Sequence, residues 1–221
     1  MALYPPEKIV TVEFYRVILE FLSLVFLQAP EPDIVDQLVT GNPFGGWPVD
    51  SQDPDLKNGL ALLEGFCATW QAGEIDLLRQ DFSALFEGVD QALVPPYESV
   101  HLTGGPDVFD PQTLAVRAYY ERYGLKVPLK DRLPDDHLSY EFQFLATFCD
   151  QLVEAWRIRD AAAITALLDD ALTFMTAHPL RWLPTFSSRV SSLAQTDFYR
   201  GMALLALATV RGLQDYLRYL K

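Results

Sequence analysis

The sequence predicts an all-α protein, folded as a single-domain helical bundle of about eight to ten helices. Apolar residues recur at intervals of three and four, which places them along one face of a helix. Proline, aspartate and glycine residues mark the expected starts and ends of these segments. Apolar–polar alternation never continues long enough to predict a convincing strand, and no repeat of fixed period is present.

The first expected helix lies between proline residues, within residues 5–30. It is the most apolar part of the chain, but it contains Glu13, Arg16 and Glu20, spaced so that all three lie on one face. Each of these charges would cost about 2.5–3.5 kcal/mol at the centre of a bilayer. We therefore expect an amphipathic helix rather than a membrane span.

The remaining helices are expected in order along the chain, within residues 32–41, 53–73, 74–88, 110–124, 138–156, 160–178, 178–195 and 196–221. Two of them begin with an Asp-Pro pair, Asp53–Pro54 and Asp110–Pro111, which suits an N-cap followed by proline in the first helical position. Glycines at 41, 73, 88 and 124 are expected to end others. The helix from Leu138 has a regular apolar stripe, at Leu138, Phe142, Leu145, Cys149, Leu152 and Trp156.

The longest irregular stretch covers residues 88–110 and is rich in proline and glycine. Loops of this length inside a compact domain are often functional. We expect one domain over residues 1–221, with a weak seam near residues 88–110.

The net charge is −13, and it is unevenly distributed. Residues 1–110 carry 18 acidic and 4 basic side chains, whereas residues 111–221 carry 12 and 13. This acidity disfavours nucleic acid and anionic membranes as partners and favours cationic ones. The alternative is that the charge only keeps a very apolar protein soluble.

Two further observations predict a cytoplasmic protein. The N-terminal sequence lacks the basic start, short apolar run and cleavage site of an export signal. Cys67 and Cys149 both lie in apolar helical patterns, which indicates buried free thiols in a reducing compartment.

Motifs for common catalytic and metal sites are absent from the sequence. The cysteines and the three histidines lie far apart and lack paired ligand spacing, so no metal site is expected. There is no phosphate-binding Walker loop and no Gly-x-Ser-x-Gly nucleophile elbow.

The segment Pro134-Asp135-Asp136-His137 precedes the apolar helix that begins at Leu138. One interpretation is a helix cap, because an aspartate at a helix start accepts amide hydrogens and suits the positive end of the helix dipole. The other is a binding site. A second aspartate, the histidine and Glu141 one turn further exceed what a cap requires, and paired carboxylates suit a guanidinium group.

Four segments in a fixed order resemble the TorD/DmsD family of redox-enzyme maturation chaperones, which is related to the NarJ group. They are LRQDFSALFEG (78–88), PPYESVHL (95–102), YERYGLKVPLKDRLPDDHLSYEFQFL (120–145) and HPLRWLPTFSSRV with TDFYRGMALL (178–205). The resemblance covers most of the chain from about residue 54.

The resemblance implies a cytoplasmic, all-helical chaperone that is not an enzyme. Such a protein binds the twin-arginine signal peptide of a molybdenum-containing oxidoreductase precursor and holds it until the molybdenum cofactor is loaded. It implies no tightly bound cofactor, although relatives handle the molybdenum cofactor or GTP transiently, and it implies a monomer or a domain-swapped dimer.

The family pattern places the signal-peptide site at five residues of this chain: Leu85, Phe86, Tyr97, Asp136 and His137. Phe82, Pro134 and Glu141 are the expected supporting residues. Phe82 and Tyr97 stand where relatives often have tryptophan, so the aromatic character is kept. The acidic surface beside apolar side chains would complement a peptide with a basic end and an apolar stretch.

Two other functions fit the same residues. The chain could be a helical interaction or scaffold module, in which the Asp-Asp-His stretch is only a cap. It could instead be a helical enzyme that uses Asp136, His137 and Glu141 as acid, base and orienting group.

Overall fold

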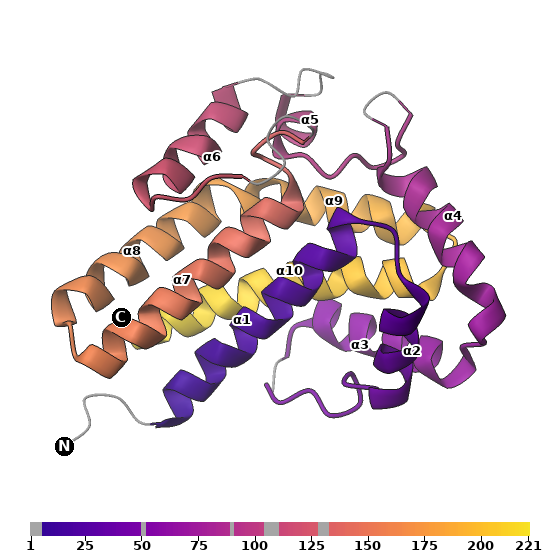
Figure 1. The fold of residues 1–221 in the computed structure, drawn as a ribbon, viewed down its shortest axis with the longest axis horizontal. Coiled ribbons are helices and arrows are strands. Elements are labelled where there is room, and N and C mark those ends of the chain that lie inside the picture. Colours follow the sequence, from indigo (N-terminus) through magenta and orange to yellow (C-terminus); the bar gives the residue numbers. More distant parts are fainter. Residues whose placement is uncertain (1–5, 50–51, 89–90, 104–110, 128–132) are drawn as a thin grey trace. The chain divides into compact units, whose positions relative to one another are not determined.

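The computed structural model describes residues 6–49, 52–88, 91–103, 111–127 and 133–221 of the chain. These residues form ten α-helices and one short 3₁₀-helix, η1, and contain no β-strand (Figure 1). The α-helices are α1 (Pro6–Leu27), α2 (Pro32–Gly41), α3 (Pro54–Thr69), α4 (Ile75–Phe86), α5 (Glu98–Thr103), α6 (Pro111–Arg122), α7 (Leu138–Ile158), α8 (Ala161–Ala177), α9 (Pro179–Leu193) and α10 (Asp197–Leu220), with η1 at Ala72–Glu74. The predicted all-α class is confirmed.

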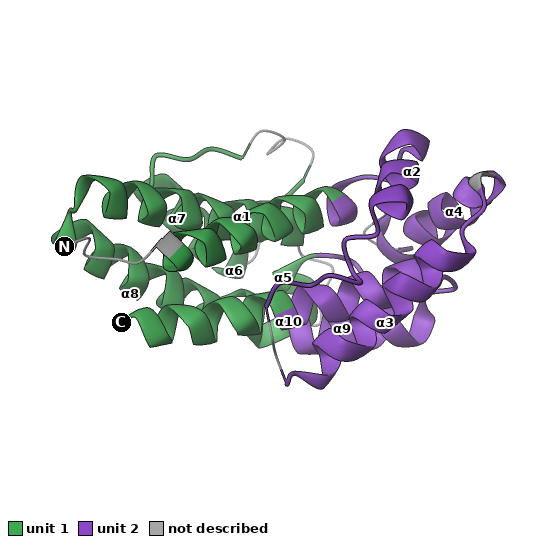
Figure 2. Ribbon diagram, turned by 90° about the horizontal axis from the view of Figure 1, so that it is seen from below, with its two compact units in different colours: residues 1–24, 97–182, 209–221 green, residues 25–96, 183–208 purple. Residues whose placement is uncertain are grey.

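The chain divides into two compact units (Figure 2). Unit 1 contains residues 1–24, 97–182 and 209–221, and unit 2 contains residues 25–96 and 183–208. The chain crosses between the units four times, and the crossing between Pro96 and Tyr97 lies within residues 88–110. The prediction of one domain over the whole chain stays a prediction.

Helix α7 contributes more buried residues to unit 1 than any other helix, and they lie on nearly every side of it. It packs beside α8 (Figure 1). Phe144 on α7 lies edge-on to Tyr120 of α6 and Phe174 of α8, with ring centroids 4.9 and 4.7 Å apart. Such pairs stabilise by about 0.5–1.5 kcal/mol beyond the burial of their area.

An aromatic cluster forms the core of unit 2. Phe86 of α4 contacts Phe26, Phe82, Phe186 and Tyr199, with ring centroids 5.4 to 6.0 Å apart. Elsewhere in this unit α3 and α10 approach closely at two glycines, since a Cβ atom added to Gly201 would lie 2.6 Å from the Leu63 side chain.

Local signals placed several helix ends correctly. The Asp53 carboxylate caps α3 by accepting from the amides of Asp55 and Leu56, as predicted. The glycines at 88 and 124 adopt positive φ angles of 86° and 68° just after α4 and α6. The other expected cap, Asp110, lies outside the described residues.

Three expectations about the helices were wrong. Helix α2 is ended by Asn42 in the left-handed region, with Gly41 still inside the helix. Helix α3 ends at Thr69, with Trp70 as its C-cap, and Gly73 lies inside the separate helix η1. The stretch 88–110 is not irregular throughout, since α5 occupies Glu98–Thr103.

The described residues contain two free, buried cysteines, Cys67 and Cys149, as the sequence predicted. No helix within the described ranges is long and apolar enough to cross a membrane.

Candidate functional site

The Pro134–His137 segment lies in unit 1, between α6 and α7, and all four of its residues are buried. Asp136 has no exposed surface, and Asp135 and His137 are 5% and 3% exposed. Burial of two carboxylates requires hydrogen-bonding partners, because an unpaired buried charge is costly. The partners found come from α5, α6 and α7, so the segment joins three helices.

Asp136 holds the start of α5 and the start of α6. One carboxylate oxygen accepts from the Ser99 amide at 2.8 Å, and the other accepts from the Thr113 hydroxyl at 3.0 Å. Its carbonyl oxygen also accepts from the Glu98 amide at 3.1 Å. Burial raises the pKa of Asp136, whereas the hydrogen bonds from Ser99 and Thr113 lower it.

His137, rather than an aspartate, is the N-cap of α7. Its Nδ1 accepts from the Ser139 amide at 3.2 Å, and burial lowers the pKa of the ring to about 3. The imidazole is therefore neutral, with the proton on Nε2. Its ring lies edge-on to Tyr97 at 5.0 Å, and the two residues also form an isolated antiparallel bridge.

Asp135 contacts α6 and does not cap α7. Its carboxylate accepts from Arg117 Nε at 2.9 Å, and this hydrogen bond raises the pKa of the guanidinium. Its carbonyl oxygen accepts from the Tyr120 hydroxyl at 3.1 Å. Asp135 therefore ties the end of the loop to the middle and last turn of α6.

Glu141 was expected to orient His137, but its contacts lie elsewhere. One oxygen accepts from Trp182 Nε1 at 3.4 Å, and the other has no hydrogen-bond partner among the described residues. Burial and the neighbouring Glu98 carboxylate raise the pKa of Glu141 well above its usual value. Glu98 in turn accepts from His178 Nδ1 at 2.9 Å, so these buried groups form a second polar cluster.

The remaining predicted residues are also buried. Leu85, Phe86 and the supporting Phe82 belong to unit 2, with 0%, 5% and 3% of their surface exposed. Tyr97 belongs to unit 1, where burial raises the pKa of its hydroxyl to about 12. Direct contact with a peptide would require accessible side chains, whereas Leu85 and Phe86 are both buried in the core of unit 2.

This geometry disfavours acid–base catalysis by His137 and Glu141. The Nδ1 of His137 already serves α7, so it could take a proton from a substrate only if the first turn of the helix opened. A general base must also lie within hydrogen-bond reach of the proton that it removes. Within the described ranges, no three His, Cys, Asp or Glu residues are grouped to hold a metal ion.

Several residues of the cluster were not singled out from the sequence. Ser99, Thr113 and Arg117 contact the two aspartates from positions 18 to 37 residues away along the chain. His178 reaches Glu98 across 80 residues. Glu98 and Ser99 lie within the PPYESVHL segment and His178 begins the HPLRWLPTFSSRV segment, whereas no motif marked Thr113 and Arg117.

The family model described as "Nitrate reductase delta subunit" matches residues 50–188. A chaperone protein TorD of Vibrio cholerae is 31% identical over 134 residues, which cover 61% of this chain and 59% of that relative. A probable Tat proofreading chaperone DmsD of Haemophilus influenzae is 24% identical over 86% of this chain and 85% of its own.

A third relative spans nearly the whole sequence. The chaperone protein YcdY of Escherichia coli is 25% identical over 207 residues, which cover 92% of this chain and 95% of that relative. The family match covers more than half of the chain and includes all eight residues selected from the sequence. The chain therefore belongs to the TorD/DmsD family, whose family model is described as the nitrate reductase delta subunit.

Proposed function

We propose that this protein is a maturation chaperone of the cytoplasm, which binds the twin-arginine signal peptide of a molybdenum-containing oxidoreductase precursor. It holds the precursor until the molybdenum cofactor has been loaded. The main support is the family match over residues 50–188, together with relatives that carry chaperone names. The net charge of −13 adds a physical reason, because it attracts a peptide with a basic end.

In this proposal Asp136 and His137 act by positioning helices. An arginine of the peptide could pair directly with Asp136 only if the carboxylate gave up its bonds to Ser99 and Thr113 and became exposed. Breaking a buried, charge-assisted hydrogen bond costs about 1.5–3 kcal/mol. We therefore expect the peptide to bind exposed surfaces of α6 and α7. The Asp135–His137 segment holds these two helices in place.

The proposal also gives an indirect, structural role to three other predicted residues, Leu85, Phe86 and Tyr97. The first two residues maintain the core of unit 2, and Tyr97 packs against the His137 ring. Their substitution is expected to change peptide binding through the folding of the surrounding helices.

Co-purification from the native host tests the proposal. The tagged chain is expected to retain a molybdoenzyme precursor that has its signal peptide, and not the same precursor with the signal deleted. Equal recovery of both forms would show that the signal peptide is not what is recognised. No recovery of either would argue against the maturation role.

A further inference from the structure

A small apolar pocket lies on the surface of unit 1, directly beside the Asp135–His137 segment. Its floor consists of the buried rings of Tyr120, Tyr140 and Phe144, and its volume is about 110 Å³. Two of these rings contact the segment, since the Tyr120 hydroxyl donates to the Asp135 carbonyl and the Tyr140 ring lies 5.8 Å from the His137 ring. The segment therefore fixes the floor of the pocket.

The turn after α6 builds one wall of the pocket. Gly124 has a φ angle of 68°, and its amide donates to the Glu121 carbonyl at 3.0 Å. The Leu125 amide donates to the Tyr120 carbonyl at 2.9 Å, which completes a Schellman motif. This turn brings Leu125 and Val127 into the pocket lining. Glycine is favoured at position 124 because a side chain adds strain in the left-handed region.

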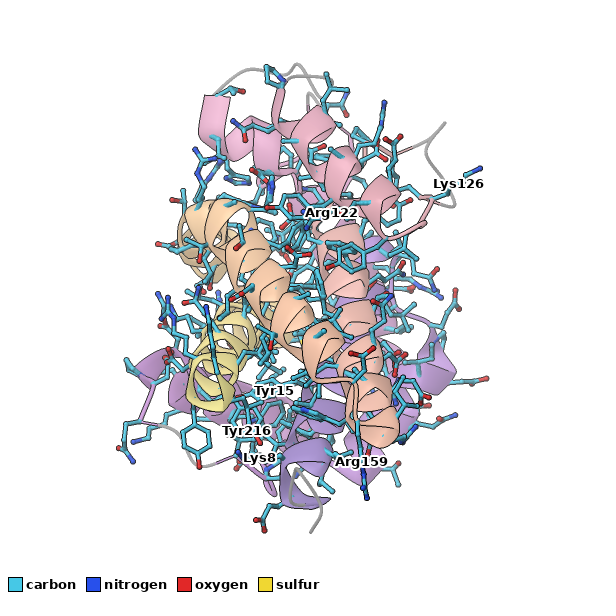
Figure 3. All side chains as sticks on the ribbon, turned by 90° about the vertical axis from the view of Figure 1, so that its left-hand side faces the viewer. Lys8, Tyr15, Arg122, Lys126, Arg159 and Tyr216 are labelled. Carbon is cyan, nitrogen blue, oxygen red and sulfur yellow. The ribbon has the colours of Figure 1, made fainter. Side chains whose placement is uncertain are left out.

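Helix α7 builds the opposite side. Tyr140, Gln143, Phe144 and Thr147 all line the pocket, and their spacing of three and four residues places them on one helical face. Gln143 is exposed and Thr147 is half-buried, so these two form a polar rim. Lys126 completes the rim, and Figure 3 shows its side chain directed away from the helices.

The size of the pocket selects its occupant. Sites for drug-sized molecules usually have volumes of about 300–1,000 Å³. An apolar cavity of about 150 Å³ holds a molecule the size of benzene. A pocket of about 110 Å³ with an aromatic floor therefore suits one aliphatic side chain of about leucine size, and the polar rim can bind the backbone that presents it.

Carboxylates continue from the pocket along the same face of α7. Asp150 and Glu154 follow Thr147 at three and seven residues, which is about 4.5 and 10.5 Å further along the helix. Arg16 and Arg157 join them to Glu13 and Glu20 of α1 through ion pairs of 2.7 to 3.9 Å. We call these four exposed carboxylates the acidic ridge. They outnumber the two guanidinium groups that they contact, so the ridge keeps negative charge for a basic partner.

We propose that the pocket receives one leucine-sized side chain of the bound peptide, while basic residues of the peptide lie over the acidic ridge. This inference rests on the proposed function and gives the peptide a location on unit 1. It also explains how the buried Asp135–His137 segment can affect binding without touching the peptide.

A pocket-filling substitution with a matched control tests the inference. Thr147→Phe places a ring in the pocket, whereas Thr165→Phe places one on the exposed surface of α8. Both threonines donate to the carbonyl four residues earlier, at 2.9 and 3.0 Å, so the local change is alike. The probe is a synthetic peptide with an Arg-Arg pair followed by a leucine-containing apolar stretch, and affinity is measured by calorimetry.

We expect Thr147→Phe to weaken binding by about tenfold or more and Thr165→Phe to leave it unchanged. Asp150→Lys should weaken binding and reduce its salt dependence, unlike Asp215→Lys on α10. Circular dichroism verifies that each variant is folded. If Thr147→Phe and Asp150→Lys bind like wild type, the inferred location is wrong and the proposed function stands. If wild type fails to bind the peptide, both fail.

A cross-linking experiment keeps the inference testable if Thr147→Phe does not fold. Gln143 is exposed, so Gln143→Cys supplies a surface thiol at the rim, while Cys67 and Cys149 are buried. A peptide with an activated cysteine in place of one leucine should cross-link to Gln143→Cys and not to Thr165→Cys. Equal cross-linking of the two variants would overturn the inferred location.

Discussion

His137 and Glu141 lie one turn apart at the start of α7, and burial acts on them in opposite directions. It lowers the pKa of the imidazole to about 3 and raises that of the carboxyl group well above its usual value. Burial disfavours the charged form of either group. The neighbouring carboxylates have other contacts, since Asp135 lies against the Arg117 guanidinium and Glu98 lies 2.9 Å from His178 Nδ1.

The Asp136 carboxylate is expected to be important for stability. Asp136→Ala leaves the Ser99 amide and the Thr113 hydroxyl without their acceptor in a buried site, which should lower the free energy of unfolding by about 2–4 kcal/mol. Asp136→Asn keeps one acceptor oxygen and should cost less. Urea denaturation measures both variants. A loss below about 1 kcal/mol for Asp136→Ala, as expected for a redundant cap, would contradict the structure.

His137 should make stability depend on pH. Because its folded pKa is near 3 and its unfolded pKa is near 6.5, its contribution is complete above pH 6.5 and is lost as the pH falls toward 3. The slope is at most about 1.4 kcal/mol per pH unit. His137→Asn keeps an N-cap acceptor without titrating, so wild type should lose stability relative to this variant between pH 7 and pH 5. Chemical denaturation gives the free energy of unfolding at each pH. Parallel pH profiles for wild type and His137→Asn would refute this prediction.

At the scale of the helices, local sequence signals were sufficient for nine of the ten. Periodic apolar residues and caps such as Asp53 placed these elements within a few residues of their ends. Helix α5 was missed because it is only six residues long, and its first amides bind Asp136, which lies 37 residues later. A helix that depends on a distant partner leaves no periodic pattern of its own.

The candidate site was likewise predictable only where the signal was local. The Asp135–His137 segment stood out in the sequence because it contains more polar groups than a helix cap needs. Its partners Thr113 and Arg117 could not be found, since nothing in the local sequence of α6 marks them. Burial of Phe86 also depends on contacts from α9 and α10, about 100 residues away.

Helix α4 should be essential for the core of unit 2. Phe86→Ala removes a ring that contacts four other aromatic side chains, and large-to-small substitutions of this kind cost about 3–5 kcal/mol. We expect a large fall in melting temperature, and peptide binding should fall only in proportion to unfolding. Leu77→Ala, at an exposed position of the same helix, is the control. A stable Phe86→Ala variant with lost binding would instead support direct contact.

The same helix fixes the turn between α9 and α10 through Asp81. This buried carboxylate accepts from the Gln195 amide, the Thr196 amide and the Thr196 hydroxyl, at 2.6 to 3.1 Å. Asp81→Ala should therefore lower the free energy of unfolding by about 2–4 kcal/mol, and Asp81→Asn should recover part of it. Thermal denaturation tests this, and equal melting temperatures for Asp81→Ala and wild type would exclude the role.

At the scale of the whole molecule, charge is divided unequally between the units. Unit 2 contains 13 acidic and 4 basic residues, and unit 1 contains 17 and 13. The net charge of −13 should accelerate association with a basic peptide, and salt should weaken this attraction because the Debye length shortens.

The most direct test of signal-peptide recognition is calorimetric titration with three synthetic peptides that differ only at the arginine pair. We expect the Arg-Arg peptide to bind more tightly than its Lys-Lys and Ala-Ala counterparts, since arginine forms forked hydrogen bonds with carboxylates. Its affinity should fall when salt is raised from about 50 mM to about 500 mM. Equal affinity for all three peptides, or no binding of any, would contradict recognition of the twin-arginine signal.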